Sequence, residues 1–228
     1  MVDDSTVAPA SEVILPFLHK NIQVTYTKNP VNLGWINTVT IGNYVHGSYM
    51  LLLADDDRLV TGALKYLINI LSKKEIDIFF HKPYFSEQVN VLPEVEINPS
   101  ANLYSGIASY ISDLHHRTRE YKDLISLFSF YSSIIVRTTY RQYALEKSNT
   151  AVLKENSFPH EIVAFYDLKN KKIGYTEQPL VVGRLLNESY PSSTKLITHL
   201  TRVMNYIEQQ NNLSQLGEWQ QIKRTCIQ

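Results

Sequence analysis

Three consecutive carboxylates are the clearest chemical signal in this sequence. Asp55, Asp56 and Asp57 directly follow an apolar run over residues 49–54, which is typical of a strand buried on both faces. Ligands bind at the carboxyl ends of strands in open parallel sheets, and adjacent carboxylates repel one another unless a cation neutralises them. Mg²⁺ and Mn²⁺ prefer oxygen ligands such as carboxylates, and Mg²⁺ often binds substrate phosphates at the same time. The triplet therefore indicates a divalent-metal site or, alternatively, a solvated loop whose acids favour the next helix.

Two weaker signals precede the triplet. Asp3 and Asp4 form an acidic pair near the start of the sequence, where acids also serve as ordinary helix caps. Asn32 and Gly34 form an Asn-x-Gly element shortly after Lys28. A glycine there permits a close backbone approach or a positive φ, and the element is as typical of a plain turn as of a binding loop.

Candidate acid–base groups occur in the second half of the chain. His160 and Glu161 follow Pro159 at the expected start of a helix. Histidine titrates near neutral pH and burial raises the pKa of a glutamate, so either residue could act as a general base. A proline with an acid in the first turn is equally typical of a helix start without a catalytic role. Arg184 follows a late apolar strand, where it could reach a diphosphate or form a structural ion pair.

The elements that must position these residues alternate between strand and helix. We expect strands at 22–26, 49–54 and 76–80, and a helix over 37–45. A second helix, capped by Thr61, should bury an apolar face made of Leu64, Leu67, Ile68 and Leu71. This alternation predicts an α/β fold with a parallel sheet. Residues 83–104 lack a long period, and helical spacing returns at 107–114 and again from residue 196.

Composition narrows the class of protein. The chain has 228 residues, of which 44% are hydrophobic, so it can bury a sizeable core and is not disordered. Lys plus Arg (22) equals Asp plus Glu (22), which argues against nucleic acid as the partner. The single cysteine, Cys226, excludes a disulfide scaffold. The sequence shows no secretion signal and no apolar stretch of the roughly 20 residues that span a bilayer, so a cytoplasmic protein is expected.

The order of these motifs resembles the family 2 glycosyltransferases. Val2-Asp3-Asp4-Ser5-Thr6, then Asn32-Leu33-Gly34, then the run from Gly47 to Asp57 are similar to the VDD, N-x-G and DxD elements of that family. The stretch from Asp55 to Leu64 is most similar to abequosyltransferase-like enzymes of bacterial surface polysaccharide synthesis. The resemblance is specific over residues 1–80 and thin beyond them.

The resemblance implies a GT-A (Rossmann-like) α/β domain with a mixed, mostly parallel sheet flanked by helices. The domain would cover residues 1–190, with a nucleotide-sugar-binding half at 1–82 and an acceptor-binding half at 83–190, followed by a helical tail at 191–228. Family members begin with a strand and loop ahead of the VDD element. The first βα unit is therefore expected to be missing, which predicts weak stability or self-association because a central strand would lack its partner.

The resemblance also assigns roles to the residues. Asp4 would contact the nucleotide base and Asp57 would hold Mg²⁺ or Mn²⁺. The remaining donor-binding positions would be Asp3, Lys28, Asn32, Gly34, Asp55, Asp56 and Arg184. Glu161 is the favoured catalytic base, with His160 as a competitor or an acceptor contact. The His-Glu pair departs from the Glu-Asp or Asp-Asp of the family.

The function implied is an inverting, divalent-metal-dependent transfer of a sugar from a nucleotide-sugar to a glycan hydroxyl. The acceptor would be a surface glycan of the O-antigen or capsule type, including a lipid-linked one, reached by peripheral contact at the inner face of the membrane. The alternative is a truncated or degenerate transferase that binds a glycan or a partner without catalysis. A phospho-acceptor receiver domain is disfavoured, because such a domain is about half this length and carries a single acid after its middle strand.

Overall fold

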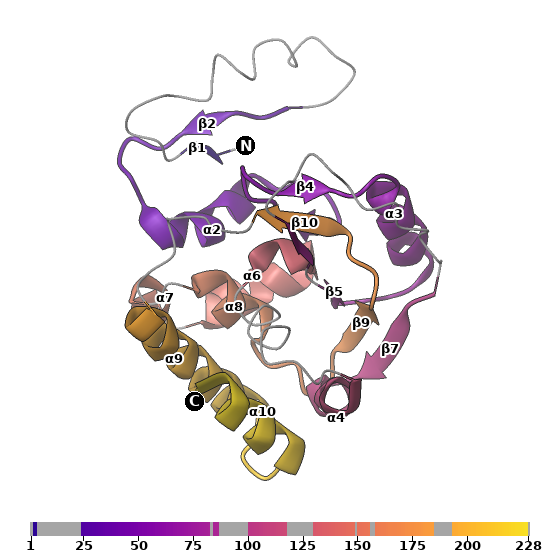
Figure 1. The fold of residues 1–228 in the computed structure, drawn as a ribbon. Helices are drawn as coiled ribbons and strands as arrows, with labels where there is room; N and C mark the ends of the chain where they lie inside the picture. The colour runs from indigo at the N-terminus through magenta and orange to yellow at the C-terminus, as the bar shows by residue number, and fades with distance from the viewer. Residues whose placement is uncertain are drawn as a thin grey trace.

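The protein has a mixed α/β fold in which helices flank the sheets (Figure 1). The computed structural model describes residues 2–3, 24–82, 84–86, 100–117, 130–148, 150–155, 158–184 and 193–227, and the structural statements below concern these residues. The expected α/β class with a mixed sheet is confirmed.

The main sheet has five strands in the order β3-β8-β5-β9-β7. The strands are β3 (Tyr49–Leu51), β8 (Ile134–Arg137), β5 (Ile78–His81), β9 (Lys172–Thr176) and β7 (Asn102–Ser105). Only β5 and β9 run parallel within this sheet, and the other neighbours are antiparallel. The expectation of a mostly parallel sheet is therefore wrong. The reason is β8, which comes from much later in the chain and runs antiparallel to both β3 and β5.

Two smaller sheets lie beside the main one. β10 (Val181–Arg184) pairs antiparallel with β4 (Arg58–Leu59) and parallel with β6 (Tyr84–Ser86). β1 (Val2–Asp3) pairs parallel with β2 (Thr27–Lys28), a few residues later than the strand expected at 22–26, of which residues 22 and 23 lie outside the described part. Because β4 begins directly after the acidic triplet, its pairing with β10 brings the end of β10 toward the triplet.

The helices occupy the segments between these strands. The expected helix at 37–45 is confirmed as a short α-helix, α2 (Asn37–Thr40), continued by a 3₁₀ turn, η3 (Ile41–Tyr44). The others are η2 (Gly34–Ile36), α3 (Ala63–Lys73), α4 (Ile107–Arg117), η4 (Tyr131–Ser133), α6 (Thr138–Lys147), α7 (Thr150–Lys154), α8 (Pro159–Ala164), α9 (Ser193–Asn211) and α10 (Gly217–Ile227). Among the described helices, none is long and apolar enough to cross a membrane.

Apolar residues form two clusters, one on each face of the main sheet. Alternate residues of β5 point to opposite faces, as the period of a strand requires, so Phe80 belongs to one cluster and Phe79 to the other. Phe80 stacks on Tyr110 of α4 and Phe165, with ring centroids 5.1 and 5.2 Å apart. Helices α9 and α10 contribute to the Phe80 cluster, where Trp219 is fully buried. The two C-terminal helices therefore share the core of the sheet.

Helix α3 covers the Phe79 face with a different stripe from the one expected. It begins after Gly62, a left-handed residue (φ 85°), with no side-chain cap, so the expected Thr61 cap is wrong. Its buried residues are Ala63, Tyr66, Leu67 and Ile70, while Leu64 and Ile68 are 58% and 61% exposed. The buried stripe is thus rotated by about one residue, or 100° around the helix. The start at Gly62 and the packing on Phe79 set this rotation.

The rotation leaves an apolar groove of about 700 Å³ between α3 and the end of the main sheet. Leu64 and Ile68 line it from the helix, and Tyr49, Leu51 and Ile135 line it from the sheet. β3 is the end strand of this sheet, with no partner on its outer edge among the described strands. An apolar face beside an open strand edge is a surface that other chains can pair with.

A matched pair of substitutions tests the orientation of α3. We expect Ile70→Ala to lower the free energy of unfolding by roughly 2–5 kcal/mol, because it leaves a cavity in the core. Ile68→Ala should change it by no more than about 0.5 kcal/mol, since the side chain is largely solvated. Urea denaturation of both variants at one pH measures the two values. A larger loss for Ile68→Ala than for Ile70→Ala would contradict this orientation.

Candidate functional site

The acidic triplet lies where the sequence predicts it, just beyond the carboxyl end of a sheet strand. β3 ends at Leu51, and the chain then turns through Asp55 and Asp56 into β4. The backbone N–H of Asp57 donates to the carbonyl of Ala54 (3.3 Å) and closes this turn. Asp55 is exposed, whereas Asp56 and Asp57 are partly buried. The turn therefore directs one of the three carboxylates toward the protein.

Asp57 is the member of the triplet whose carboxylate accepts hydrogen bonds from distant segments of the chain. The Ser132 hydroxyl of η4 donates to Asp57 Oδ2, and a backbone hydrogen bond from Arg184 reaches the same carboxylate. The pKa of Asp57 is raised to about 6, chiefly by burial and also by the charge of Asp56, and hydrogen bonds from Ser132, Arg184 and Ala54 offset only part of these effects. A divalent cation held by this carboxylate would offset both causes, so the surroundings of Asp57 fit a metal ion.

A buried histidine that the sequence analysis did not single out supports Ser132. His81, at the end of β5, has Nε2 3.0 Å from the carbonyl oxygen of Ser132. Its Nδ1 lies 3.0 Å from the carbonyl oxygen of Lys82 and 3.4 Å from the backbone nitrogen of Leu180. Burial lowers the pKa of His81, so the ring is neutral. With the proton on Nε2, the ring donates to Ser132 and accepts from Leu180, and it links β5 to η4.

The N-terminal candidates are placed only in part. Strand register pairs Asp3 of β1 with Lys28 of β2, so the backbones of these two predicted donor-binding residues lie side by side. Asp4 lies outside the described residues. The Asn-x-Gly element forms a local turn, in which Asn32 Oδ1 accepts from the backbone N–H of Gly34 (2.7 Å). Gly34 has φ 56° and open space around the position of a Cβ, so it serves for its positive φ and not for close approach.

The predicted acid–base pair opens helix α8 and is buried. His160 is 5% exposed and Glu161 0% exposed. His160 Nε2 lies 3.3 Å from Glu161 Oε1, and the nitrogens and carboxyl oxygens of the pair have no hydrogen bond within the described part of the chain. Burial raises the pKa of Glu161, and the neighbouring His160 offsets this in part. The pair lies at a helix start, as expected, and the structure places Glu161, the favoured base, in the core.

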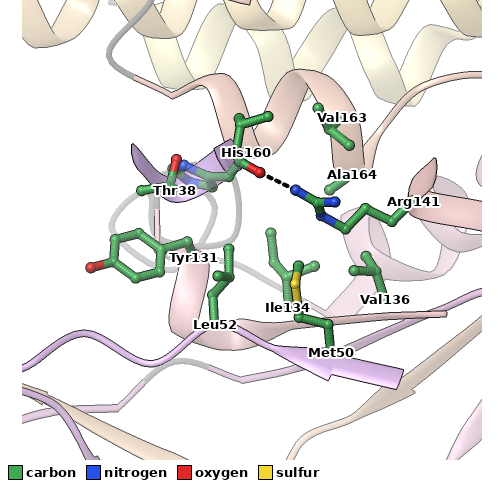
Figure 2. A pocket seen from close by; sticks show the side chains of 11 residues that line it. Thr38, Met50, Leu52, Tyr131, Ile134, Val136, Arg141, His160, Val163 and Ala164 are labelled. Carbon is green, nitrogen blue, oxygen red and sulfur yellow. Dashed lines mark hydrogen bonds between the residues drawn. The ribbon is translucent and has the colours of Figure 1, made fainter. Parts of the chain in front are cut away.

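His160 lines a small cavity (Figure 2). Thr38, His160 and Arg141 lie along one side of this cavity together with the apolar Val163 and Ala164, and a second set of apolar residues lies along the other side. This second set is Met50, Leu52, Ile134 and Val136, with Tyr131 at one end. The ring of Tyr131 lies 5.1 Å, centroid to centroid, from the ring of His160. Tyr131, which lines the cavity, and Ser132, which donates to the Asp57 carboxylate, are consecutive residues of η4.

The oxygen-only chemistry around Asp57 suits a hard divalent cation that binds substrate as well. Within the described residues, no group of three or more His, Cys, Asp or Glu side chains could hold a metal ion by itself. Mg²⁺ usually keeps one or two carboxylates and fills its remaining positions with water and substrate phosphates. Asp57, with Asp55 or Asp56 from the adjoining turn, matches that pattern better than a site built entirely of protein ligands.

Comparisons with known proteins relate this architecture to solved glycosyltransferases. No family model matches the sequence, and no curated protein matches it. Residues 1–349 of Staphylococcus aureus TarS in complex with UDP match with a TM-score of 0.61 and 14% identity, covering 99% of this chain and 60% of that one. The complex of the same protein with UDP-GlcNAc matches with a TM-score of 0.60 and 15% identity, covering 99% and 61%.

These likenesses establish the fold. TarS is a glycosyltransferase of the GT-A type, and this chain spans about 60% of the matched TarS structure. At such low identity they do not single out the abequosyltransferase-like subgroup. The chain has the GT-A glycosyltransferase fold that the order of its sequence motifs predicts.

Proposed function

We propose that this chain transfers a sugar from a nucleotide-sugar donor to a hydroxyl of a glycan acceptor, with inversion at the anomeric carbon. The observation that carries the proposal is the partly buried Asp57 carboxylate just beyond the end of β3, held by Ser132 and by the backbone of Arg184. This is the edge of a sheet at which α/β proteins bind ligands. The UDP and UDP-GlcNAc complexes of TarS support a uridine diphosphate sugar as donor.

The donor would bind across the triplet and the ends of β1, β2 and β10. Asp57 would hold Mg²⁺ or Mn²⁺, which neutralises the leaving diphosphate. Arg184, exposed at the end of β10, adds a positive charge on the same side. Asp3, Asp4 and Lys28 are proposed to bind the nucleoside. Asn32 and Gly34 would shape the loop next to it.

We assign the general base to His160. The sequence favoured Glu161, but that carboxyl is fully buried and does not line the cavity, whereas His160 does. A base must reach the acceptor hydroxyl directly or through one water. His160 would take the proton, and Glu161, 3.3 Å away, would stabilise the resulting imidazolium. The T-shaped contact with Tyr131 fixes the plane of the imidazole ring.

The remaining details extend the same proposal. A surface-glycan acceptor, lipid-linked and reached at the cytoplasmic face of a membrane, rests on the sequence motifs. Self-association would use the open edge of β3 and the groove beside α3. The second candidate function is a non-catalytic module that binds nucleotide or glycan, motivated by His-Glu standing where the family has two acids.

Removal of the Asp57 carboxylate tests the donor site. We expect Asp57→Asn to weaken Mn²⁺-dependent UDP binding at least tenfold, because the metal loses its protein ligand. The exposed control Glu75→Gln should bind as the unaltered protein does. Isothermal titration calorimetry with and without Mn²⁺ measures both. Equal UDP affinities for all three proteins would overturn the metal role of Asp57.

The raised pKa of Asp57 predicts a pH dependence. UDP–Mn²⁺ affinity should rise as pH increases from 5 to 7, because the metal needs the ionised carboxylate and its pKa is about 6. The stability of the metal-free protein should instead fall as the pH rises. A carboxyl whose pKa is higher folded than unfolded stabilises the fold at low pH, and this stabilisation is lost as pH rises from about 4 through 6.

The two trends can be measured separately. Calorimetry across this pH range reports the affinity, and thermal melts without metal report the stability. Asp57→Asn should flatten the part of each profile centred near pH 6. A variant that keeps both profiles unchanged would show that another group titrates there.

The assignment of the base is tested by comparing two amide substitutions. We expect His160→Gln to lower kcat by about 10²–10⁴-fold with UDP binding unchanged, as is typical of a lost general base. Glu161→Gln should lower kcat less, because it only weakens support of the imidazolium. Single-turnover transfer assays and thermal melts of both variants separate chemistry from folding. A larger loss of kcat for Glu161→Gln than for His160→Gln would assign the base to Glu161. If the unaltered protein binds UDP but shows neither transfer nor donor hydrolysis, the non-catalytic module would be favoured.

A further inference from the structure

Arg141 is a buried cation without a counter-ion. Its side chain extends from α6 and is only 4% exposed. The guanidinium donates one hydrogen bond, to the carbonyl of Val39 in α2 (Figure 2). No acidic side chain forms an ion pair with it among the described residues. A guanidinium has five N–H donors, so most of its hydrogen-bonding capacity is unused.

The guanidinium is held firmly in place. A Cβ built on Gly42 would lie 1.9 Å from Arg141 Cζ, so the guanidinium rests directly on the bare backbone of Gly42. Burial lowers the pKa of Arg141, and no nearby carboxylate offsets this. Burying a charge without a partner is strongly unfavourable. A fold that positions such a charge so tightly, at the wall of a cavity, is arranged for a ligand of opposite sign.

A second polar group, His160, lines the same cavity. Its Nδ1 has no hydrogen-bond partner within the described residues, and its Nε2 approaches only Glu161 Oε1, at 3.3 Å. Thr38 lies on the same side, and Met50 and Leu52 lie on the opposite side (Figure 2). Glu161, whose Oε1 lies 3.3 Å from His160 Nε2, does not line the cavity. The lining therefore carries one guanidinium among mostly apolar side chains and no carboxylate.

We propose that this cavity binds an anionic group of the acceptor, a carboxylate or a phosphate, whose oxygen accepts hydrogen bonds from Arg141. The inference rests on the proposed function, in that His160 deprotonates a hydroxyl of the same acceptor. The cavity has a volume of about 20 Å³, which admits a single oxygen atom and not a whole phosphate. The group enters end-on, and the rest of the acceptor lies outside, past His160. Acidic glycans would thus be favoured over neutral ones.

Binding of small anions tests the proposal without nucleotide or transfer activity. We expect sodium phosphate or sodium acetate to raise the melting temperature of the unaltered protein, saturably, relative to sodium chloride at equal ionic strength and pH. Arg141→Met should weaken this effect at least tenfold in apparent dissociation constant. The control Arg137→Met removes an arginine that has its own partners, Asp77 and the carbonyl of Ile76, and should bind the anions as before. Arg141→Lys keeps the charge with fewer donors and should bind with intermediate affinity.

The outcomes separate the two anion chemistries and the two hypotheses. Saturation by phosphate alone identifies a phosphate-bearing acceptor, and saturation by acetate alone identifies a carboxylate-bearing one. If Arg141→Met fails to fold, Arg141→Lys decides, because an affinity equal to that of the unaltered protein would overturn the proposal. Equal anion responses in Arg141→Met and the unaltered protein would also overturn it, leaving Arg141 as a cap for α2. A failure of UDP–Mn²⁺ binding alongside intact anion binding would instead count against the proposed transferase.

Discussion

The placement of one partly buried carboxylate organises this molecule. Asp57 sits where water is scarce, so its charge must be met by protein donors, and these come from distant parts of the chain: Ser132 from η4 and the backbone of Arg184 from β10. His81 holds η4 in turn through the Ser132 carbonyl. Four segments meet at this point, and a shift in any one would leave a charge or a carbonyl without its partner.

The η4 turn connects two regions of opposite charge, because Ser132 binds Asp57 and Tyr131 lines the cavity that holds Arg141. The triplet concentrates negative charge beyond β3, while Arg141 supplies positive charge to the cavity that begins at Tyr131, one residue before Ser132. A cation-bound diphosphate suits the first region and an anionic acceptor suits the second. Opposite potentials in the two regions would align donor and acceptor before contact and discourage binding in the reverse sense.

Local patterns predicted local features well. The acidic triplet after an apolar strand, the positive φ of Gly34 and the helix that opens at Pro159 depend on neighbours a few residues away. The contacts of Ser132 and Arg141 depend on residues about 70–100 positions distant, and β8 also pairs with strands from much earlier in the chain. The rotated stripe of α3 depends on packing against Phe79 of the sheet. Hydrophobic periodicity carries no information on strand direction, and a lone Arg, Ser or His has no pattern that reveals its partner.

The packing of α10 has a consequence for how the chain is made. Ser112 of α4 donates to Glu218 of α10 (3.0 Å), across 106 residues, and Trp219 lies in the core shared with the sheet. Contacts of such long range form slowly, because the chain must lose the entropy of closing a long loop before the contacts stabilise it. During synthesis the face of α4 that meets α10 stays uncovered until Gly217–Ile227 have been made. Its apolar surface is open to chaperones or to neighbouring chains during that interval.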